Sequence, residues 1–312
     1  GQSNMEGKAK LSLLEQQVKN PKTRDLFKHL QNDQGEWVKR DDVSIKFLDR
    51  HGPLTVGYGS PNCIGPELEF GNTVGDASEQ PVLLIKAAWG GKSLFRDFRS
   101  PSAGMPGDDV LQRELEQAQK KSPDTTLDDV KARYGHYYRL MLEEVNNTLE
   151  QRDELFPNLA GKPYEISGLV WFQGWNDMIS EEYTAAYAEN MAHFIRDVRK
   201  DFKTPKLPVV IGVLGVGGTQ EEKPSAKKDA FKEAQAAAAK LPEFQGNVAV
   251  VETDQYWDVE ADAVFKKGWK ENLAEWNTVG SDYPFHYLGS AKCYSRIGRG
   301  FGEAMLKLEA GQ

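Results

Sequence analysis

Four segments of the chain are nearly continuous apolar runs bounded by turn residues, namely 81–88, 166–172, 207–214 and 247–253. Runs of this length are typical of strands that are buried on both faces of a parallel sheet. A fifth segment, Val43-Ser44-Ile45-Lys46-Phe47, alternates apolar and polar residues and predicts a peripheral strand. The pattern therefore predicts at least five strands, most of them parallel.

Between these runs, apolar residues recur at helical spacing, as on the face of 181–201 that carries Tyr187, Met191 and Phe194. The predicted helices cover 66–75, 127–155, 181–201, 227–241 and 289–308, with one or two short ones in 8–35. Strands that alternate with helices indicate an α/β protein, here a three-layer α/β/α sandwich around a mostly parallel, flavodoxin-like sheet. Neither a repeat nor a linker divides residues 1–312, so we expect one domain with a helical insertion around 100–160.

Composition narrows the class of partner. The formal net charge of −8 argues against nucleic acid or an anionic membrane surface as a partner, because both are negatively charged and bind positively charged protein surfaces. No apolar run approaches the roughly 18 residues of a membrane span. The two cysteines, Cys63 and Cys293, are too few for a disulfide scaffold and leave open two thiols or one bridge. Because we find no Cys/His spacing of the zinc type, we expect neither metal nor cofactor.

The first residues, Gly-Gln-Ser-Asn-Met-Glu-Gly, place a hydroxyl between two amide side chains and close to two glycines. A serine alone indicates little, but three later segments each offer another part of an acyl-transfer site. These are Gly90-Gly91, the segment 173–177 (Gln-Gly-Trp-Asn-Asp) and the segment 282–286 (Asp-Tyr-Pro-Phe-His). We therefore take Ser3 as the candidate nucleophile.

Two of these segments directly follow buried strands, where doubly wound sheets bind ligands. Gly90 and Gly91 let the backbone approach a ligand and direct N–H groups at an anion, although an ordinary turn gives the same pattern. Asn176 has an amide that can donate to an oxyanion, and Gln173 can assist. Asp177 fits a helix cap or a turn.

A serine hydroxyl needs a neighbouring base, and histidine suits this role because its pKa lies near neutrality. His286 is the best candidate of five, since it stands in a loop just before the last helix. The acid that orients it is open between Asp282, in the same loop, and Asp254, after the strand 247–253. A backbone carbonyl is a third possibility.

In the order of these four segments, from the serine segment to the histidine segment, the chain resembles the SGNH (GDSL-like) hydrolases. Among them it resembles the carbohydrate acetylesterases of the sialate O-acetylesterase and acetylxylan esterase type. The resemblance covers nearly the whole chain. It implies Ser3 as nucleophile, His286 as base, and an oxyanion hole made by Ser3, Gly90, Gly91 and Asn176. It further implies a serine esterase that removes O-acetyl groups from a carbohydrate through an acyl-enzyme, acts without a cofactor, and is secreted or periplasmic.

The chain departs from the pattern of this superfamily in two places. Many members place the aspartate three residues before the histidine, whereas Tyr283 stands there and Asp282 lies four before. A strand should also deliver the serine to the sheet, and none precedes Gly1, so we expect that the first strand of the fold is not in this sequence.

Several further residues are candidates for substrate contacts, by stacking on sugar rings or by pairing with polar groups. They are Gln2, Glu67, Arg99, Gln173 and Trp175, and each has an equally good structural role. Two other functions stay open: a lipid or thioester hydrolase of the same fold, and a carbohydrate-binding protein without activity.

Overall fold

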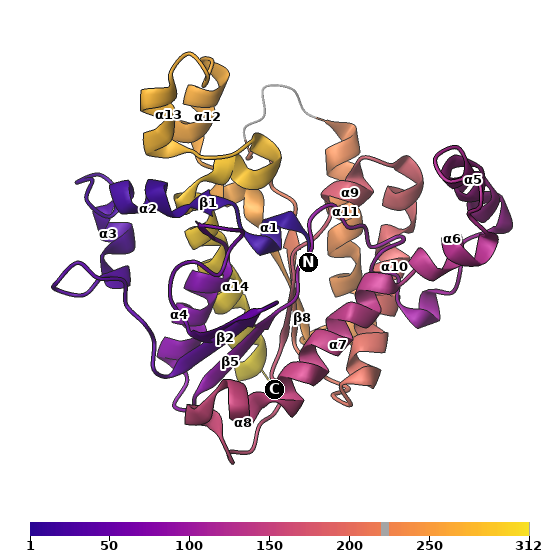
Figure 1. Cartoon of the computed structure of the whole chain (residues 1–312), viewed down its shortest axis with the longest axis horizontal. Coiled ribbons are helices and arrows are strands. Elements are labelled where there is room, and N and C mark those ends of the chain that lie inside the picture. Colours follow the sequence, from indigo (N-terminus) through magenta and orange to yellow (C-terminus); the bar gives the residue numbers. More distant parts are fainter. Residues whose placement is uncertain (220–224, 312) are drawn as a thin grey trace.

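The computed structural model describes residues 1–219 and 225–311 and has an α/β architecture (Figure 1). One three-stranded sheet has the order β3-β2-β5, in which β2 (Val43–Phe47) is parallel to β5 (Val82–Lys86) and antiparallel to β3 (Arg50–Pro53). A second sheet consists of three parallel strands, β6 (Leu169–Trp171), β7 (Val209–Val213) and β8 (Val248–Glu252). The short strands β1 (Ala9–Lys10) and β4 (Cys63–Ile64) form an antiparallel pair. All five strands predicted from the sequence are present.

The edge strands β5 and β6 of the two three-stranded sheets lie on either side of a cavity of about 180 Å³, which is lined by apolar residues of both strands and of the neighbouring helices. At one end of the cavity, the Gly1 nitrogen donates to Ala87 O (2.9 Å) and the Trp89 N–H donates to Gly1 O (3.1 Å). The Gln2 N–H donates to Phe172 O on the other side (3.4 Å). The continuous sheet that we expected is thus found as two halves, because β5 and β6 lie too far apart to pair directly.

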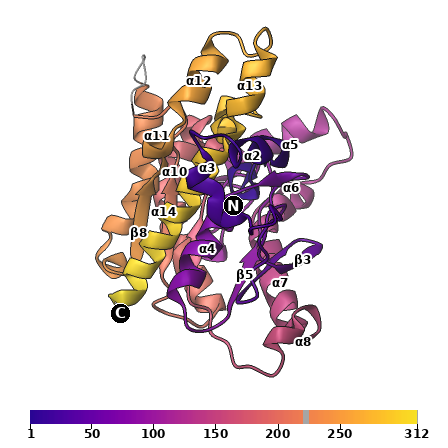
Figure 2. The same cartoon turned by 90° about the vertical axis from the view of Figure 1, so that its left-hand side faces the viewer.

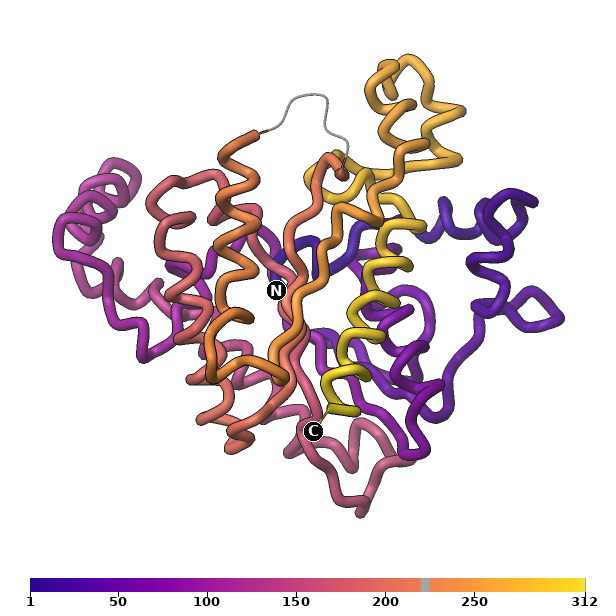
Figure 3. The backbone as a smooth tube through the Cα atoms, turned by 180° about the vertical axis from the view of Figure 1, so that it is seen from behind, coloured from indigo at the N-terminus to yellow at the C-terminus, as the bar shows by residue number. Residues whose placement is uncertain are grey.

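Helices cover the strands from both sides (Figures 1 and 3). Helices α4 (Glu67–Ala77) and α14 (Ala291–Ala310) pack along each other on one side, and α10 (Glu181–Asp201) and α11 (Ala226–Ala237) on the other. Close approach of α14 to the sheet requires Gly212, where a Cβ would lie 2.6 Å from the rings of Phe172 and Phe301. The core between these layers includes Val209, Ile211 and Ile297.

Between β5 and β6 the chain carries four helices, α5 (Asp108–Gln119), α6 (Leu127–Arg133), α7 (His136–Glu150) and α8 (Arg152–Leu155). A separate apolar cluster, which includes Val110, Leu111 and Val130, holds α5 and α6 against Tyr183 of α10. Helix α5 lies within the helical insertion expected around 100–160, but its own bounds were not predicted, because its apolar residues form only a narrow stripe in a polar segment.

The helices α12 (Val259–Lys266) and α13 (Leu273–Val279) were also not predicted, and they project as a pair beyond the strands (Figures 1 and 2). The remaining short helices are α1 (Ser3–Glu6), α2 (Leu11–Gln17), α3 (Arg24–Phe27) and α9 (Trp175–Met178). Cys63 and Cys293 are free thiols, both buried. Among residues 1–219 and 225–311, we find no helix with the length and apolar character needed to cross a bilayer.

Candidate active site

The backbone turns sharply at the start of α1 and presents Ser3 there. Gln2 is extended (φ −114°, ψ −161°), and the helix begins at the next residue. The first N–H groups of a helix have no intrahelical acceptor, so the Ser3 N–H is free to bind another group. The side chain of Gln2 fixes this turn from the inside, since its Oε1 accepts a hydrogen bond from the Gly174 N–H (3.0 Å).

The side chains of Ser3, His286 and Asp282 lie in a row. His286 Nε2 is 3.0 Å from Ser3 Oγ, and His286 Nδ1 is 3.2 Å from Asp282 Oδ2. The second contact is an ion-pair distance in which the ring N–H is not aligned for a hydrogen bond. Burial alone would raise the pKa of Asp282, but His286 and the Tyr283 N–H outweigh burial and lower that pKa. Asp282 therefore stays ionised beside the imidazole.

Asp254, the alternative acid, has a different partner. Its carboxylate lies 2.5 Å from Lys232 Nζ of α11. Of the two acids considered from the sequence, the structure brings only Asp282 to His286.

An unusual backbone holds the histidine loop. Tyr287 and Leu288, directly after His286, both have positive φ (51° and 61°), a conformation that costs about 1–3 kcal/mol per residue outside glycine. The buried hydroxyl of Tyr287 compensates by accepting a hydrogen bond from the Gly215 N–H (2.7 Å) and by pairing with Thr253 Oγ1. The core therefore fixes the direction in which His286 points.

Asn4 ties this loop to α1, a role that we did not foresee. Its Nδ2 donates to Phe285 O (3.1 Å), and its Oδ1 accepts from the Tyr294 hydroxyl (3.2 Å). Because Asn4 is the neighbour of Ser3, one buried side chain sets the distance between nucleophile and base. Its position beside the serine was the only available sequence signal.

The glycine pair lies beside the serine. A Cβ at Gly90 would be 3.8 Å from Ser3 Cβ and 3.4 Å from Glu6 Oε1. Burial raises the pKa of Glu6, but hydrogen bonds with Lys8, Ser60 and the Gly90 backbone outweigh it and keep that pKa low. The Glu6 carboxylate therefore lies next to the Gly90 backbone. Gly91 has a φ of +72°, and no atom lies within 4 Å of the place that a Cβ would occupy.

Asn176 lies in the first turn of α9, which Gly174 joins to the serine turn. Its side chain is half-buried and makes no hydrogen bond with any residue that the structure describes. An amide left free at such a place can donate to an oxyanion.

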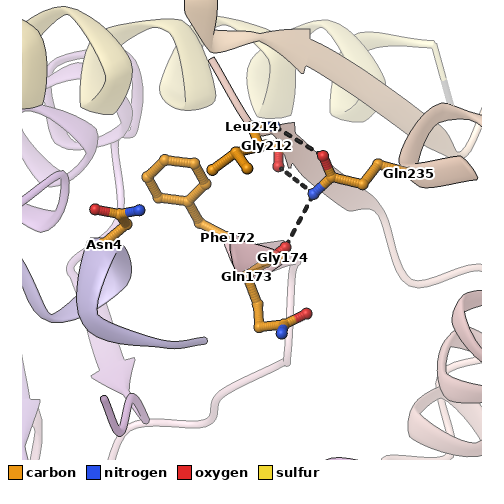
Figure 4. A pocket seen from close by; sticks show the side chains of 7 residues that line it. All are labelled: Asn4, Phe172, Gln173, Gly174, Gly212, Leu214 and Gln235. Atoms are coloured by element: carbon orange, nitrogen blue, oxygen red, sulfur yellow. Dashed lines mark hydrogen bonds between the residues drawn. The ribbon is translucent and has the colours of Figure 1, made fainter. Parts of the chain in front are cut away.

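The end of β6 that precedes Asn176 is fixed by the side chain of Gln235 (Figure 4). Gln235 Nε2 donates to Gln173 O (2.9 Å), and Gln235 Oε1 accepts from the Leu214 N–H (2.8 Å).

Asp177, which we expected to be a cap or turn residue, anchors the segment after the glycine pair. Its carboxylate accepts the N–H groups of Leu94 and Phe95 (both 2.9 Å) and Nε2 of Gln173 (2.6 Å). Burial raises its pKa to about 7, although these three donors favour the charged form.

We expect Asp177→Ala to lower the melting temperature strongly, because it leaves three buried donors without an acceptor, each at about 1–3 kcal/mol. The control Asp109→Ala removes an exposed carboxylate of α5 and should change stability by less than about 0.5 kcal/mol. Thermal unfolding of both variants checks this. Equal melting temperatures would show that Asp177 does not hold the glycine segment.

Four of the five expected substrate contacts are used inside the protein instead. Gln2, Glu67 and Gln173 are at most 6% exposed, and Glu67 accepts from Lys86 Nζ (2.7 Å) and the Gly65 N–H (2.8 Å). Arg99 donates to the carbonyls of Phe95, Ala103 and Gly104. The polar groups of these four residues are therefore already hydrogen-bonded within the protein. Trp175 remains, half-buried and 5.7 Å from the ring of Phe285.

A family model and a related protein that match this chain are both described as carbohydrate esterases. Residues 1–264 match the family model described as carbohydrate esterase, sialic acid-specific acetylesterase. The match covers Ser3, Gly90 and Asn176 and ends before Asp282 and His286. A probable carbohydrate esterase of Arabidopsis thaliana is 32% identical over 54 residues, which is 17% of this chain and about a fifth (21%) of that protein.

Two solved structures align with this chain. A crystal structure of an Arabidopsis thaliana protein aligns over 87% of both chains with a TM-score of 0.50 and 17% identity. A carbohydrate acetylesterase from Xanthomonas citri aligns with a TM-score of 0.48 and 12% identity, over 97% of this chain and 56% of its own. Since the family model spans most of the sequence, the chain belongs to the sialic acid-specific acetylesterase family of carbohydrate esterases.

Proposed function

We propose that this protein is a serine esterase that removes O-acetyl groups from a carbohydrate through an acyl-enzyme intermediate. The observation that carries the proposal is the contact of Ser3 Oγ with His286 Nε2 at 3.0 Å, with Asp282 at the other ring nitrogen. Family membership supplies the substrate class, an acetylated carbohydrate.

The steps follow from this geometry. His286 Nε2 takes the proton of Ser3 Oγ while the oxygen attacks the acetyl carbonyl. The free Ser3 N–H and the Asn176 amide stabilise the oxyanion that forms. His286 then returns the proton to the sugar oxygen, which leaves as an alcohol. In the second half, water attacks the acetyl group on Ser3 and His286 takes a proton from that water. The bond between the acyl carbon and Ser3 Oγ then breaks, His286 returns the proton to Ser3 Oγ, and acetate leaves.

Release of acetate tests the proposal. We expect hydrolysis of a chromogenic acetate ester and release of acetate from at least one of acetylated xylan, pectin and O-acetylated sialic acids. A lipid or thioester hydrolase would prefer long acyl chains over acetate in a matched ester series. A carbohydrate-binding protein without activity would release nothing from any of them, and that result would contradict the proposal.

Asn176→Ala should lower kcat by about 10²–10³ with little change in KM, because its amide binds the oxyanion more strongly than the ground-state carbonyl. Asn146→Ala is the control, since it removes an exposed amide side chain from α7. Steady-state kinetics on the chromogenic ester checks this. An unchanged kcat for Asn176→Ala would show that the Asn176 amide does not stabilise the oxyanion.

We also infer that the two half-sheets belong to one flavodoxin-like sheet in a three-layer sandwich, and that residues 1–312 form a single domain. The support is the apolar cavity between the edges of β5 and β6, together with Gly1 and Gln2, which pair with both sides. Gly1 is bonded to Ala87 and Trp89 in the pattern of a parallel ladder.

A further inference from the structure

A row of aromatic rings begins at His286 and leads away from Ser3. The ring of Phe285 is 4.5 Å from that of His286, and Tyr283 stacks on Phe285 at 5.5 Å with an interplanar angle of 6°. Trp269 follows, edge-on to Tyr283 at 6.0 Å. We call Phe285, Tyr283 and Trp269 the aromatic strip.

Two rings of the strip, Phe285 and Tyr283, are poorly accounted for by packing in the core. Phe285 is only half-buried and lies outside the apolar core, and Tyr283 is 48% exposed. The Tyr283 hydroxyl makes no hydrogen bond with the residues that the structure describes. Large aromatic side chains that stay exposed beside a site are typical of binding surfaces.

The strip is nevertheless rigid. Trp269 is fixed between α12 and α13 by Phe265, at 6.5 Å, and by Trp276, at 5.9 Å. The backbone of Tyr283 is held as well, because its N–H donates to Asp282 Oδ1 and its carbonyl accepts from the His286 N–H (2.9 Å). A surface already fixed in this way loses little entropy when a ligand binds.

We propose that the aromatic strip binds the sugar units next to the acetylated one, so that the substrate is an acetylated oligosaccharide or polysaccharide rather than a free monosaccharide. This inference rests on the esterase function proposed above. The acetyl group must sit at Ser3, and the strip starts at the ring that touches the base. Pyranose rings present an apolar C–H face for stacking and hydroxyl groups around it, which fit the flat ring and free hydroxyl of Tyr283.

The test compares three acetate esters: a chromogenic acetate, an acetylated xylose and an acetylated xylo-oligosaccharide. The wild-type protein should have a higher kcat/KM on the oligosaccharide than on the xylose ester. In Tyr283→Ala, the ratio of kcat/KM for the oligosaccharide to that for the chromogenic ester should fall about 3- to 10-fold, as expected for the loss of one aromatic stacking contact. Tyr283→Phe should keep most of this ratio.

The matched control is Tyr164→Ala, which removes another exposed tyrosine, one that packs on Arg152 of α8. It should leave the ratio unchanged. An equal loss on all three esters in Tyr283→Ala, or no loss on any, would overturn the proposed binding role of the strip.

A binding measurement separates this inference from the esterase proposal. Ser3→Ala protein should bind unacetylated xylo-oligosaccharide in calorimetry, and Tyr283→Ala in that background should weaken binding about 3- to 10-fold. Binding without acetate release from any ester by the wild-type protein would support the strip and contradict the esterase. Acetate release with no oligosaccharide binding would do the reverse.

Discussion

Ser3→Ala is expected to abolish acetate release, with a fall in kcat on the order of 10⁴ or more, because no other group replaces the covalent step. The variant should fold normally. The lost hydroxyl contacts His286 Nε2 and contributes little packing, since it lies at the start of a four-residue helix. Kinetics on the chromogenic ester and thermal unfolding measure the two effects.

Ser12→Ala is the matched control, because Ser12 is an exposed serine of α2. It should keep full activity and the same melting temperature. Substantial turnover by well-folded Ser3→Ala protein would mean that another group attacks the ester, and the serine mechanism would be wrong.

Asp282→Asn is expected to lower kcat by about 10²–10⁴ and to change KM much less. The carboxylate at 3.2 Å from His286 Nδ1 stabilises the imidazolium that forms during the reaction, and an amide does so poorly. Kinetic constants on the chromogenic ester, measured across pH 5 to 9, check this expectation.

Asp254→Asn provides the comparison, since this carboxylate pairs with Lys232 instead. Loss of a partly exposed ion pair costs about 0–1 kcal/mol of stability and should leave kcat nearly unchanged. If the two variants had the opposite order of activity, Asp282 would not be the orienting acid. The esterase proposal would stand in that case, provided that Ser3→Ala is inactive.

The sequence by itself determined the α/β class and the places of the main elements. Helix α10 has the predicted bounds, and β2 and β7 lie within the predicted segments, because buried strands and amphipathic helices leave strong periodic patterns. The sequence pattern did not predict the bounds of α5, α12 and α13, because the apolar faces of these helices are short or narrow. The order of the blocks also indicated the family.

For the candidate site, sequence patterns predicted which residue types matter, and only tertiary structure could sort them. The sequence left both Asp282 and Asp254 as candidates for the acid. In the structure, Asp254 forms an ion pair with Lys232, whereas Asp282 lies beside His286. Likewise, Gln173 and Trp175 both follow β6. Gln173 forms hydrogen bonds inside the protein, whereas Trp175 contacts the ring of Phe285.

The physical reason is that a hydrogen-bond partner or a stacked ring comes from residues far apart in the chain. Asn4 meets Phe285 across 281 positions, and Trp269 joins the aromatic strip only because α12 and α13 carry it to the histidine loop. Local patterns record whether a side chain is apolar or polar. Which polar groups remain free for a substrate is decided when the folded chain has satisfied the others.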